Sequence, residues 1–233
     1  MIKKDYNVLL AEYLSGFATE NRIEKFNNII NSRTRYVTIA LEDIYQPHNA
    51  SAVLRSCECF GVQDVHIIEN ENKYEVNPDV ALGSSKWINL NRYNKKENNT
   101  ADCIRNLKKE GYQIVATSSH KNDYAIDQLP LNNKVALFFG TELRGLSSEV
   151  LDHADAYVKI PMYGFTESFN ISVSAAICLF SITSRLRNSE VHWQLSDKEK
   201  SDIKLQWLKN SIKGAEAIEK EFKKNQGFKI NCR

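Results

Sequence analysis

Polar side chains that could bind or activate a substrate gather in three segments of this 233-residue chain, residues 43–57, 136–147 and 160–176. Each segment contains the end of an apolar, β-branched run. In an α/β protein, ligands bind beside the carboxyl ends of the strands, so such segments are where a site is expected. Each one alone is a weak signal, and we expect a site only where the three meet.

The segment 160–176 has the most specific pattern. A proline and a glycine stand before a helix start that consists almost wholly of small residues. Ser168 or Asn170 is expected to cap this helix, since both side chains can accept hydrogen bonds from its first free backbone N–H groups. A loop held against a helix N-terminus suits an anion or a polar ligand group.

The segment 43–57 places an arginine inside a helix of small and apolar residues. Asn49 is expected to cap this helix, and Arg55 follows within it. The guanidinium group of Arg55 could grip a phosphate through its planar fork of donors. Alternatively, Arg55 extends along the surface or pairs with Glu58 three residues later, which is a structural role.

The segment 136–147 ends a buried strand at Gly140 and then presents a carboxylate. Glu142 lies in a loop bounded by Gly140 and Gly145, and Ser147 is expected to cap the next helix. Without the other segments, Glu142 could equally be a solvent-facing loop carboxylate.

The elements that position these segments alternate along the chain. Strands are predicted at 37–44, 64–69, 113–118, 134–140 and 156–162, and helices at about 5–30, 50–60, 100–111, 147–154, 170–187 and 197–224. Continuous apolar strands separated by helices are typical of a mostly parallel sheet covered on both faces. We therefore expect an α/β domain at 37–189, an N-terminal helical extension at 1–36 and a C-terminal one at 190–233.

Composition narrows the class of protein. Hydrophobic residues make up 42% of the chain, which suffices for a core, and no run approaches the roughly 18 apolar residues of a membrane span. No signal-peptide pattern is present, and the five cysteines lack CxxC pairing, so we expect a cytoplasmic protein without a metal site. No GxG occurs, which excludes a dinucleotide fingerprint and a P-loop.

Charge is divided unevenly along the chain. Residues 1–36 contain 6 basic and 4 acidic residues, 37–189 contain 15 and 18, and 190–233 contain 10 and 7. Basic end segments around a mildly acidic body fit a polyanionic partner such as RNA. Solvated helix faces would give the same distribution.

Taken in order, the three segments resemble the three motifs of the SpoU family of RNA ribose 2′-O-methyltransferases. The resemblance spans about residues 36–190, and the third motif is the most specific. Three further regions are similar to members that modify tRNA: Gln46–Ala52, Gly83–Trp87 and Trp207–Lys209. Leu143 departs from the pattern, because related tRNA enzymes often place lysine there.

The resemblance implies a fold and a cofactor that periodicity cannot supply. The fold is SPOUT-type: a parallel α/β sheet whose C-terminal part forms a deep trefoil knot, in a homodimer with the site at the interface. The knot would bind S-adenosyl-L-methionine. The cofactor-lining residues implied are Thr117, Phe139, Gly140, Thr141, Glu142, Leu143, Ile160 and Phe169.

The implied reaction is methylation of a ribose 2′-hydroxyl of tRNA, at the D-loop guanosine of position 18. Arg55 would act as the base or clamp a substrate phosphate, with Asn49 holding Arg55 in position. Glu142, Ser168 and Asn170 would orient substrate and cofactor. Ribosomal RNA is the alternative substrate, although 36 N-terminal residues are too few for the RNA-binding domain that rRNA-modifying members usually carry.

Two readings from other classes remain. A non-catalytic RNA-binding relative would be expected to lack Arg55, Asn49 or Glu142, and all three are present. A flavodoxin-like nucleotide binder is the reading if the resemblance misleads, and it predicts a monomer that does not bind S-adenosylmethionine.

Overall fold

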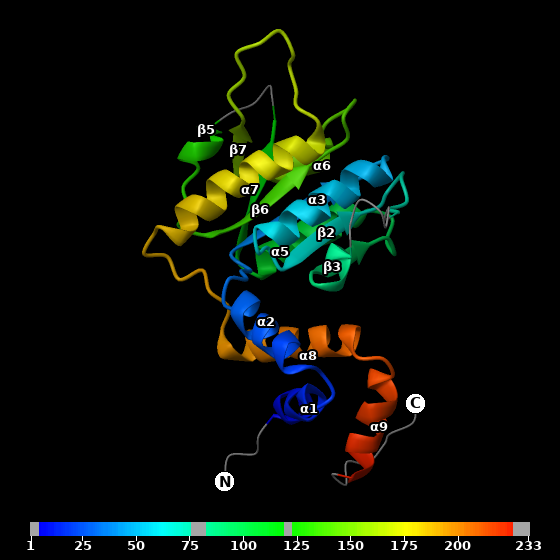
Figure 1. Cartoon of the computed structure of the whole chain (residues 1–233). Helices are drawn as coiled ribbons and strands as arrows, with labels where there is room; N and C mark the ends of the chain where they lie inside the picture. Colours follow the sequence, from blue (N-terminus) through cyan, green and yellow to red (C-terminus); the bar gives the residue numbers. More distant parts are fainter. Residues whose placement is uncertain (1–4, 76–82, 119–122, 226–233) are drawn as a thin grey trace. The chain divides into compact units, whose positions relative to one another are not determined.

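The computed structural model describes residues 5–75, 83–118 and 123–225. Contacts divide them into two compact units. One is formed by Thr34–Trp193, and the other by the described residues of Met1–Arg33 and Gln194–Arg233 (Figure 1). The two ends of the chain, which the sequence presents as separate extensions, thus group into one unit.

The Thr34–Trp193 unit is built on a sheet of seven described strands, all parallel. They are β1 (Val37–Glu42), β2 (Asp64–Ile68), β3 (Asn89–Tyr93), β4 (Tyr112–Thr117), β5 (Tyr124–Ala125), β6 (Lys134–Phe139) and β7 (Ala156–Lys159), in the order β3-β2-β1-β6-β4-β7-β5. The prediction of a parallel sheet is confirmed. Two strands were missed: β3 is polar along most of its length, and β5 has two residues, so neither makes an apolar run.

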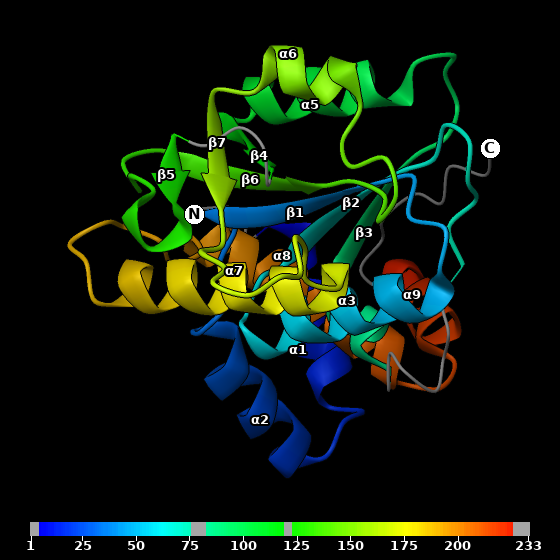
Figure 2. The ribbon, with the colours of Figure 1, turned by 90° about the horizontal axis from the view of Figure 1, so that it is seen from above.

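Helices cover both faces of this sheet, as predicted. Helices α3 (Pro47–Cys59) and α7 (Ile171–Arg187) lie along one face, and α5 (Asn99–Lys109) and α6 (Ser148–His153) lie along the other (Figure 2). Side chains alternate along β1, so Ile39 and Leu41 join the core beneath α3 and α7 while Ala40 joins the core beneath α5 and α6. Burial of these two apolar layers is what holds the strand ends in register.

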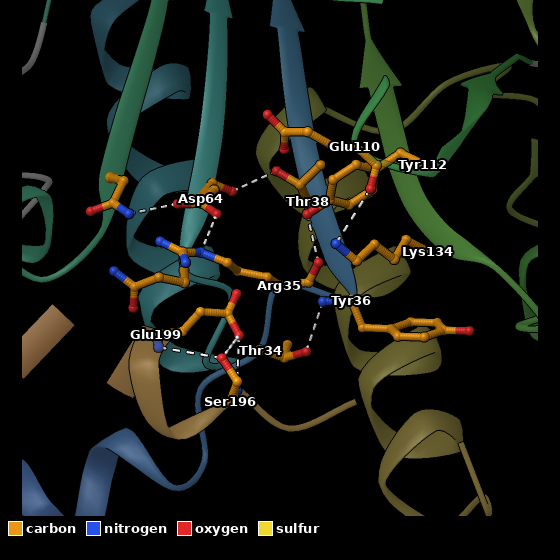
Figure 3. A network of polar contacts seen from close by, with 12 residues as sticks. Thr34, Arg35, Tyr36, Thr38, Asp64, Glu110, Tyr112, Lys134, Ser196 and Glu199 are labelled. Carbon is orange, nitrogen blue, oxygen red and sulfur yellow. Dashed lines mark hydrogen bonds and ion pairs between the residues drawn. The ribbon is translucent and has the colours of Figure 1, made fainter. Parts of the chain in front are cut away.

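The amino ends of the strands are tied together by polar contacts (Figure 3). Arg35 Nε donates to Asp64 Oδ2 at 2.8 Å, and Thr38 Oγ1 donates to the Asp64 carbonyl oxygen at 2.7 Å. The Tyr112 hydroxyl donates to the carbonyl oxygen of Arg35 at 2.5 Å. These contacts join β1 to β2 and β4 at one edge of the sheet and leave the carboxyl edge to the three polar segments.

The second unit contains α1 (Tyr6–Ser15), α2 (Glu20–Ile30), α8 (Asp197–Ser211) and α9 (Ala215–Asn225). The prediction of one continuous helix at about 5–30 and another at 197–224 was wrong. Each is broken in two, the second where Ile212 is extended and Gly214 adopts a φ of +76°. The apolar spacing of the 197–224 stretch continues through the break, which is why periodicity did not reveal it.

Specific caps and ion pairs define these terminal helices. A capping box starts α8, with Ser196 and Glu199 each bonding the other's backbone N–H (Figure 3). Glu219 of α9 accepts from Tyr6 and pairs with Lys209 and Lys223. Burial raises the pKa of the Glu219 carboxyl, but these donors outweigh it and lower the pKa to about 2, so the carboxylate links α1, α8 and α9. No helix among the described residues is long and apolar enough to cross a membrane.

Candidate active site

A cavity of about 680 Å³ opens at the carboxyl edge of the sheet. Its walls come from the segments that follow β4, β6 and β7 and from the start of α7. The structure brings together there all eight residues expected to line a cofactor site: Thr117, Phe139, Gly140, Thr141, Glu142, Leu143, Ile160 and Phe169. Strands β6, β4 and β7 are neighbours in the sheet, so the segments that follow their carboxyl ends lie side by side.

One wall is the turn Gly140–Ser147, which closes on itself. Thr141 N–H donates to the Gly145 carbonyl at 3.0 Å, and Gly145 N–H donates back to Thr141 at 2.9 Å. Gly145 has a φ of +69°, which suits glycine, and a Cβ added to Gly140 would lie 2.1 Å from the Gly145 carbonyl oxygen. Glycine is therefore required at both ends of this closure, and Glu142 is presented from its middle.

The carboxylate of Glu142 is held by two amides from distant segments. Asn49 Nδ2 donates to Glu142 Oε1 at 2.8 Å, and Asn170 Nδ2 donates to the same oxygen at 3.0 Å. Asn170 Nδ2 also lies 3.1 Å from Asn49 Oδ1. All three polar segments of the sequence thus meet in one cluster. Glu142 is an exposed loop residue, as the alternative reading expects, but its carboxylate is held by two amides.

The expectation that Asn49 caps α3 was wrong. The helix begins at Pro47 with Gln46 at the cap position, since proline is favoured in the first helical turn and fixes φ there. Asn49 is inside the helix and buried. Its side chain contacts Gln46 as well as Glu142, so its amide serves the cluster and not the helix start.

Asn170 is the cap of α7, as one of the two predicted candidates. Its Oδ1 accepts from Ser172 N–H at 2.9 Å, while its Nδ2 makes the contacts to Glu142 and Asn49. Ser168 does not cap the helix and is an exposed residue of the cavity wall. Asn170 therefore joins a helix start to the carboxylate cluster with one side chain.

Arg55 lies on the exposed side of α3 and is not among the residues that line the cavity. Within the described part of the chain, its side chain forms no hydrogen bond or ion pair, so neither the expected contact with Asn49 nor the alternative pair with Glu58 is present. The structure leaves the guanidinium fork available to a ligand.

The other wall is the segment Ile160–Phe169, which forms the long loop between β7 and α7 at the top of Figure 1. Its aromatic side chains face solvent: Tyr163 and Phe165 are almost completely exposed, and Phe169 is 42% exposed. Leu143, on the opposite wall, is also fully exposed. Of these exposed side chains, Leu143 and Phe169 line the cavity, whereas Tyr163 and Phe165 do not.

Sequence reasoning missed part of the cavity floor. Ile171, Ser174 and Cys178 line it from one face of α7, and their i, i+3, i+7 spacing could have shown this once the helix start was placed. Burial raises the pKa of the Cys178 thiol to about 12, so this thiol stays neutral near pH 7 and is no nucleophile.

The lining combines charged groups of both signs with apolar surface. Glu142 and Glu167 supply carboxylates, and Phe139, Leu143 and Ile160 supply apolar surface. Arg144 and Lys159 also line the cavity and bring positive charge to it. A volume of about 680 Å³ is within the range of cofactor pockets. No histidine lines the cavity, and the described residues contain no cluster of histidine, cysteine or acidic side chains suited to a metal ion.

Comparison with known proteins gives a consistent result. The model of the SpoU rRNA Methylase family matches residues 36–180. A Borreliella burgdorferi protein named tRNA (guanosine(18)-2′-O)-methyltransferase is 50% identical over 206 residues, which cover 88% of this chain and 93% of that protein.

Solved structures resemble the fold. The crystal structure of the A. aeolicus TrmH/SpoU tRNA modifying enzyme superposes with a TM-score of 0.73 at 27% identity, covering 83% of this chain and 98% of that one. An rRNA methyltransferase from Sinorhizobium meliloti, solved with AdoMet bound, has a TM-score of 0.57 at 24% identity and covers 67% of this chain and 59% of that one.

Proposed function

Because the chain belongs to the SpoU rRNA methylase family, we propose that it transfers a methyl group from S-adenosyl-L-methionine to the ribose 2′-hydroxyl of guanosine 18 in tRNA. The observation that carries the choice of tRNA is the length of the likeness. The 206 residues shared with the Borreliella tRNA enzyme extend beyond the family segment 36–180 into the ends of the chain. The resemblance thus includes segments outside the catalytic body.

The cavity at the carboxyl edge of the sheet is the proposed cofactor site. S-Adenosylmethionine supplies an activated methyl group on a sulfonium, and the family uses this donor. We assign the adenosine to the apolar side chains of Phe139, Leu143 and Ile160 and to backbone groups of the turn Gly140–Ser147. This mode of binding does not require a glycine-rich phosphate loop. Glu142 would face the positive charge of the donor.

Arg55 is assigned to the substrate. The Arg55 side chain is exposed and has no hydrogen-bond or ion-pair partner among the described residues. Its guanidinium group is therefore suited to bind a phosphate beside the target ribose. A guanidinium hardly deprotonates, so we favour the clamp over the base. In the reaction the 2′-oxygen forms its bond to the methyl carbon as the carbon–sulfur bond breaks, and the hydroxyl proton passes to the substrate phosphate or to solvent.

Asn49, Asn170 and Ser168 are assigned to orientation. Asn49 and Asn170 both hold the Oε1 atom of Glu142, and Ser168 is part of the cavity wall. Positioning is the main contribution expected of the protein, because the donor carries its own driving force. This replaces the expected bond from Asn49 to Arg55 with a bond to Glu142.

Methyl transfer from labelled S-adenosylmethionine to purified tRNA and to ribosomal RNA tests the substrate. We expect label in tRNA alone, and mapping of the modified ribose to position 18. Label found only in ribosomal RNA would overturn the choice of substrate and favour the alternative reading. No transfer to either RNA, with S-adenosylmethionine still bound, would favour a non-catalytic RNA-binding relative.

The role of Arg55 has its own test. Arg55→Ala should abolish methyl transfer and leave the Kd for S-adenosylmethionine within about twofold, because Arg55 does not line the cavity. Arg55→Lys keeps the charge but not the fork, and we expect it to recover only a small part of the activity. An active Arg55→Ala enzyme would refute the assignment.

We further propose a homodimer. Val173 and Phe180 are exposed large apolar residues seven positions apart on one face of α7, and Phe169, just before the helix, is also exposed. Phe180 also contacts Phe60 after α3, with ring centroids 6.4 Å apart, which widens the apolar surface. Light scattering should give twice the chain mass for the wild type and a smaller mass for Phe180→Ser.

The finer points of fold and location are also proposals. The insertion of β6 between β1 and β4 and the gathering of three later segments around one cavity support a trefoil knot like that implied by the family. Pulling the chain by its two ends should then tighten the knot and leave it in place. The stretched chain would be shorter than the full extended length of 233 residues.

A tRNA substrate supports a cytoplasmic location, which fluorescence of a tagged chain would check.

A further inference from the structure

A buried carboxylate lies next to the proposed cofactor site but outside its lining. Glu42 is the last residue of β1 and is 2% exposed. Alternation along the strand turns it to the face covered by α5 and α6, the side opposite to Leu41. No lysine, arginine or histidine pairs with Glu42 among the residues that the structure describes. Burying a carboxylate without a cation is unfavourable unless hydrogen bonds satisfy it, so its partners are informative.

The partners of Glu42 are two hydroxyls and one backbone N–H. Thr100 Oγ1 and Ser147 Oγ both donate to Glu42 Oε1 at 2.7 Å, and Ser147 N–H donates to Oε2 at 2.9 Å. An ionised carboxylate only accepts hydrogen bonds, so it fixes the direction of both hydroxyls. Ser147 Oγ is thereby left to accept from Val150 N–H, at 3.3 Å, as the cap of α6.

Glu42 therefore holds the end of the turn Gly140–Ser147 by its backbone as well as by its side chain. The start of the same turn is attached to β1 too, since Phe139 pairs with Leu41 in the sheet. Both ends of the turn are thus fastened to two consecutive residues of one strand. Between these two attachments lie Thr141, Glu142 and Leu143, which face the cavity.

We propose that Glu42 is a positioning residue that holds the turn Gly140–Ser147 in its ligand-binding shape. The inference rests on the proposed function for the identity of the ligand, S-adenosylmethionine, but not for the coupling between Glu42 and the turn. Glu42 is not one of the residues that line the cavity; it acts on the turn through Ser147.

Two substitutions with a matched control test the coupling. Glu42→Ala removes all three hydrogen bonds to Thr100 and Ser147. Glu42→Gln keeps the shape of the side chain but not its hydrogen bonds. In one orientation the amide N–H₂ faces the Ser147 N–H, which is also a donor; in the other, the hydroxyl hydrogens of Thr100 and Ser147 lose their acceptor. The control is Glu69→Gln. Glu69 is also a buried carboxylate, at the end of the neighbouring strand β2, and its bonds go to Arg92, Asn94 and Tyr74 instead of to the turn.

Calorimetric binding of S-adenosylmethionine to the full chain is the first measurement. We expect the Kd to rise about tenfold or more for Glu42→Ala, as for loss of a hydrogen bond to a charged group, and about threefold to tenfold for Glu42→Gln, as for loss of a neutral hydrogen bond. Glu69→Gln should keep the Kd within about twofold even if its Tm falls. In turnover, the KM for the donor should rise in the Glu42 variants while kcat at saturating donor changes little.

Hydrogen exchange of the ligand-free proteins is the second measurement. The amides of Thr141 and Gly145 close the turn, so a peptide covering residues 140–147 should exchange faster in both Glu42 variants and not in Glu69→Gln. If Glu42→Ala does not fold, the pair Glu42→Gln and Glu69→Gln decides.

Two outcomes separate the proposals. Wild-type Kd values and wild-type exchange of the turn in the Glu42 variants would overturn the role of Glu42 while leaving the proposed function intact. A wild-type protein that does not bind S-adenosylmethionine would overturn the cofactor assignment, and the exchange comparison would still decide the role of Glu42.

Discussion

The two walls of the cavity are built in opposite ways. The turn Gly140–Ser147 is closed by reciprocal backbone hydrogen bonds and ends at a serine whose backbone and side chain both bond to Glu42. The segment Ile160–Phe169 lies across from it with Tyr163 and Phe165 exposed to solvent. Asn170 ends this second wall and is also what connects it to the first, through Glu142.

The difference indicates a division of labour. A wall that is fixed before the ligand arrives lowers the entropy cost of binding. A wall with exposed aromatic side chains loses few packing contacts when it moves. It buries apolar surface when a ligand or a second subunit covers it. The comparison predicts that substitutions in the turn alter stability and binding together, whereas substitutions in the segment alter binding alone.

The largest effect is expected from adding one methyl group to the turn. In Gly140→Ala the new Cβ would lie 2.1 Å from the Gly145 carbonyl oxygen, so the closure must open. We expect a loss of about 3 kcal/mol or more in unfolding free energy, as for other steric conflicts with backbone, and loss of measurable S-adenosylmethionine binding. Denaturant unfolding and calorimetry measure the two.

The matched control for Gly140→Ala lies on the other wall. A Cβ added to Gly164 meets nothing within 4 Å. Gly164→Ala should therefore keep the unfolding free energy within about 0.5 kcal/mol of the wild type. Equal destabilisation by the two substitutions would mean that the walls do not differ as described.

An intermediate effect is expected at Asn170, which joins the two walls. Asn170→Ala removes both the helix cap and the bond to Glu142, and should cost about 1 kcal/mol of stability for the cap along with most of the methyl transfer. Asn170→Ser restores a capping hydroxyl but is too short to reach Glu142. Unfolding free energy should then recover while activity does not, and recovery of both would show that only the cap matters.

The sequence carried the parts of this site that depend on local pattern. Apolar runs placed β1, β4, β6 and β7, and the residue types that follow them placed Glu142 and Asn170 at one edge. The caps Ser147 and Asn170 were predictable because cap chemistry is local. Family resemblance, and not periodicity, supplied the cofactor.

The parts that the sequence did not carry depend on contacts between distant segments. Asn49 looked like a cap, since nothing local shows that its amide meets Glu142 across 93 positions of sequence. Glu42 looked like an ordinary strand end, because its partners Thr100 and Ser147 come from two other elements. Strand β3 was missed because its edge position needs no apolar run.

The smallest effect on stability, and the sharpest test of the second wall, is expected from its aromatic side chains. Tyr163→Ser and Phe165→Ser remove side chains that are almost completely exposed, so the unfolding free energy of the isolated chain should change by less than about 0.5 kcal/mol. If these rings cover the donor or meet a second subunit, the Kd for S-adenosylmethionine or the dimer mass should change nonetheless. A fall in stability with unchanged binding would invert the comparison, because it would show that the segment is held by its own packing before any ligand arrives.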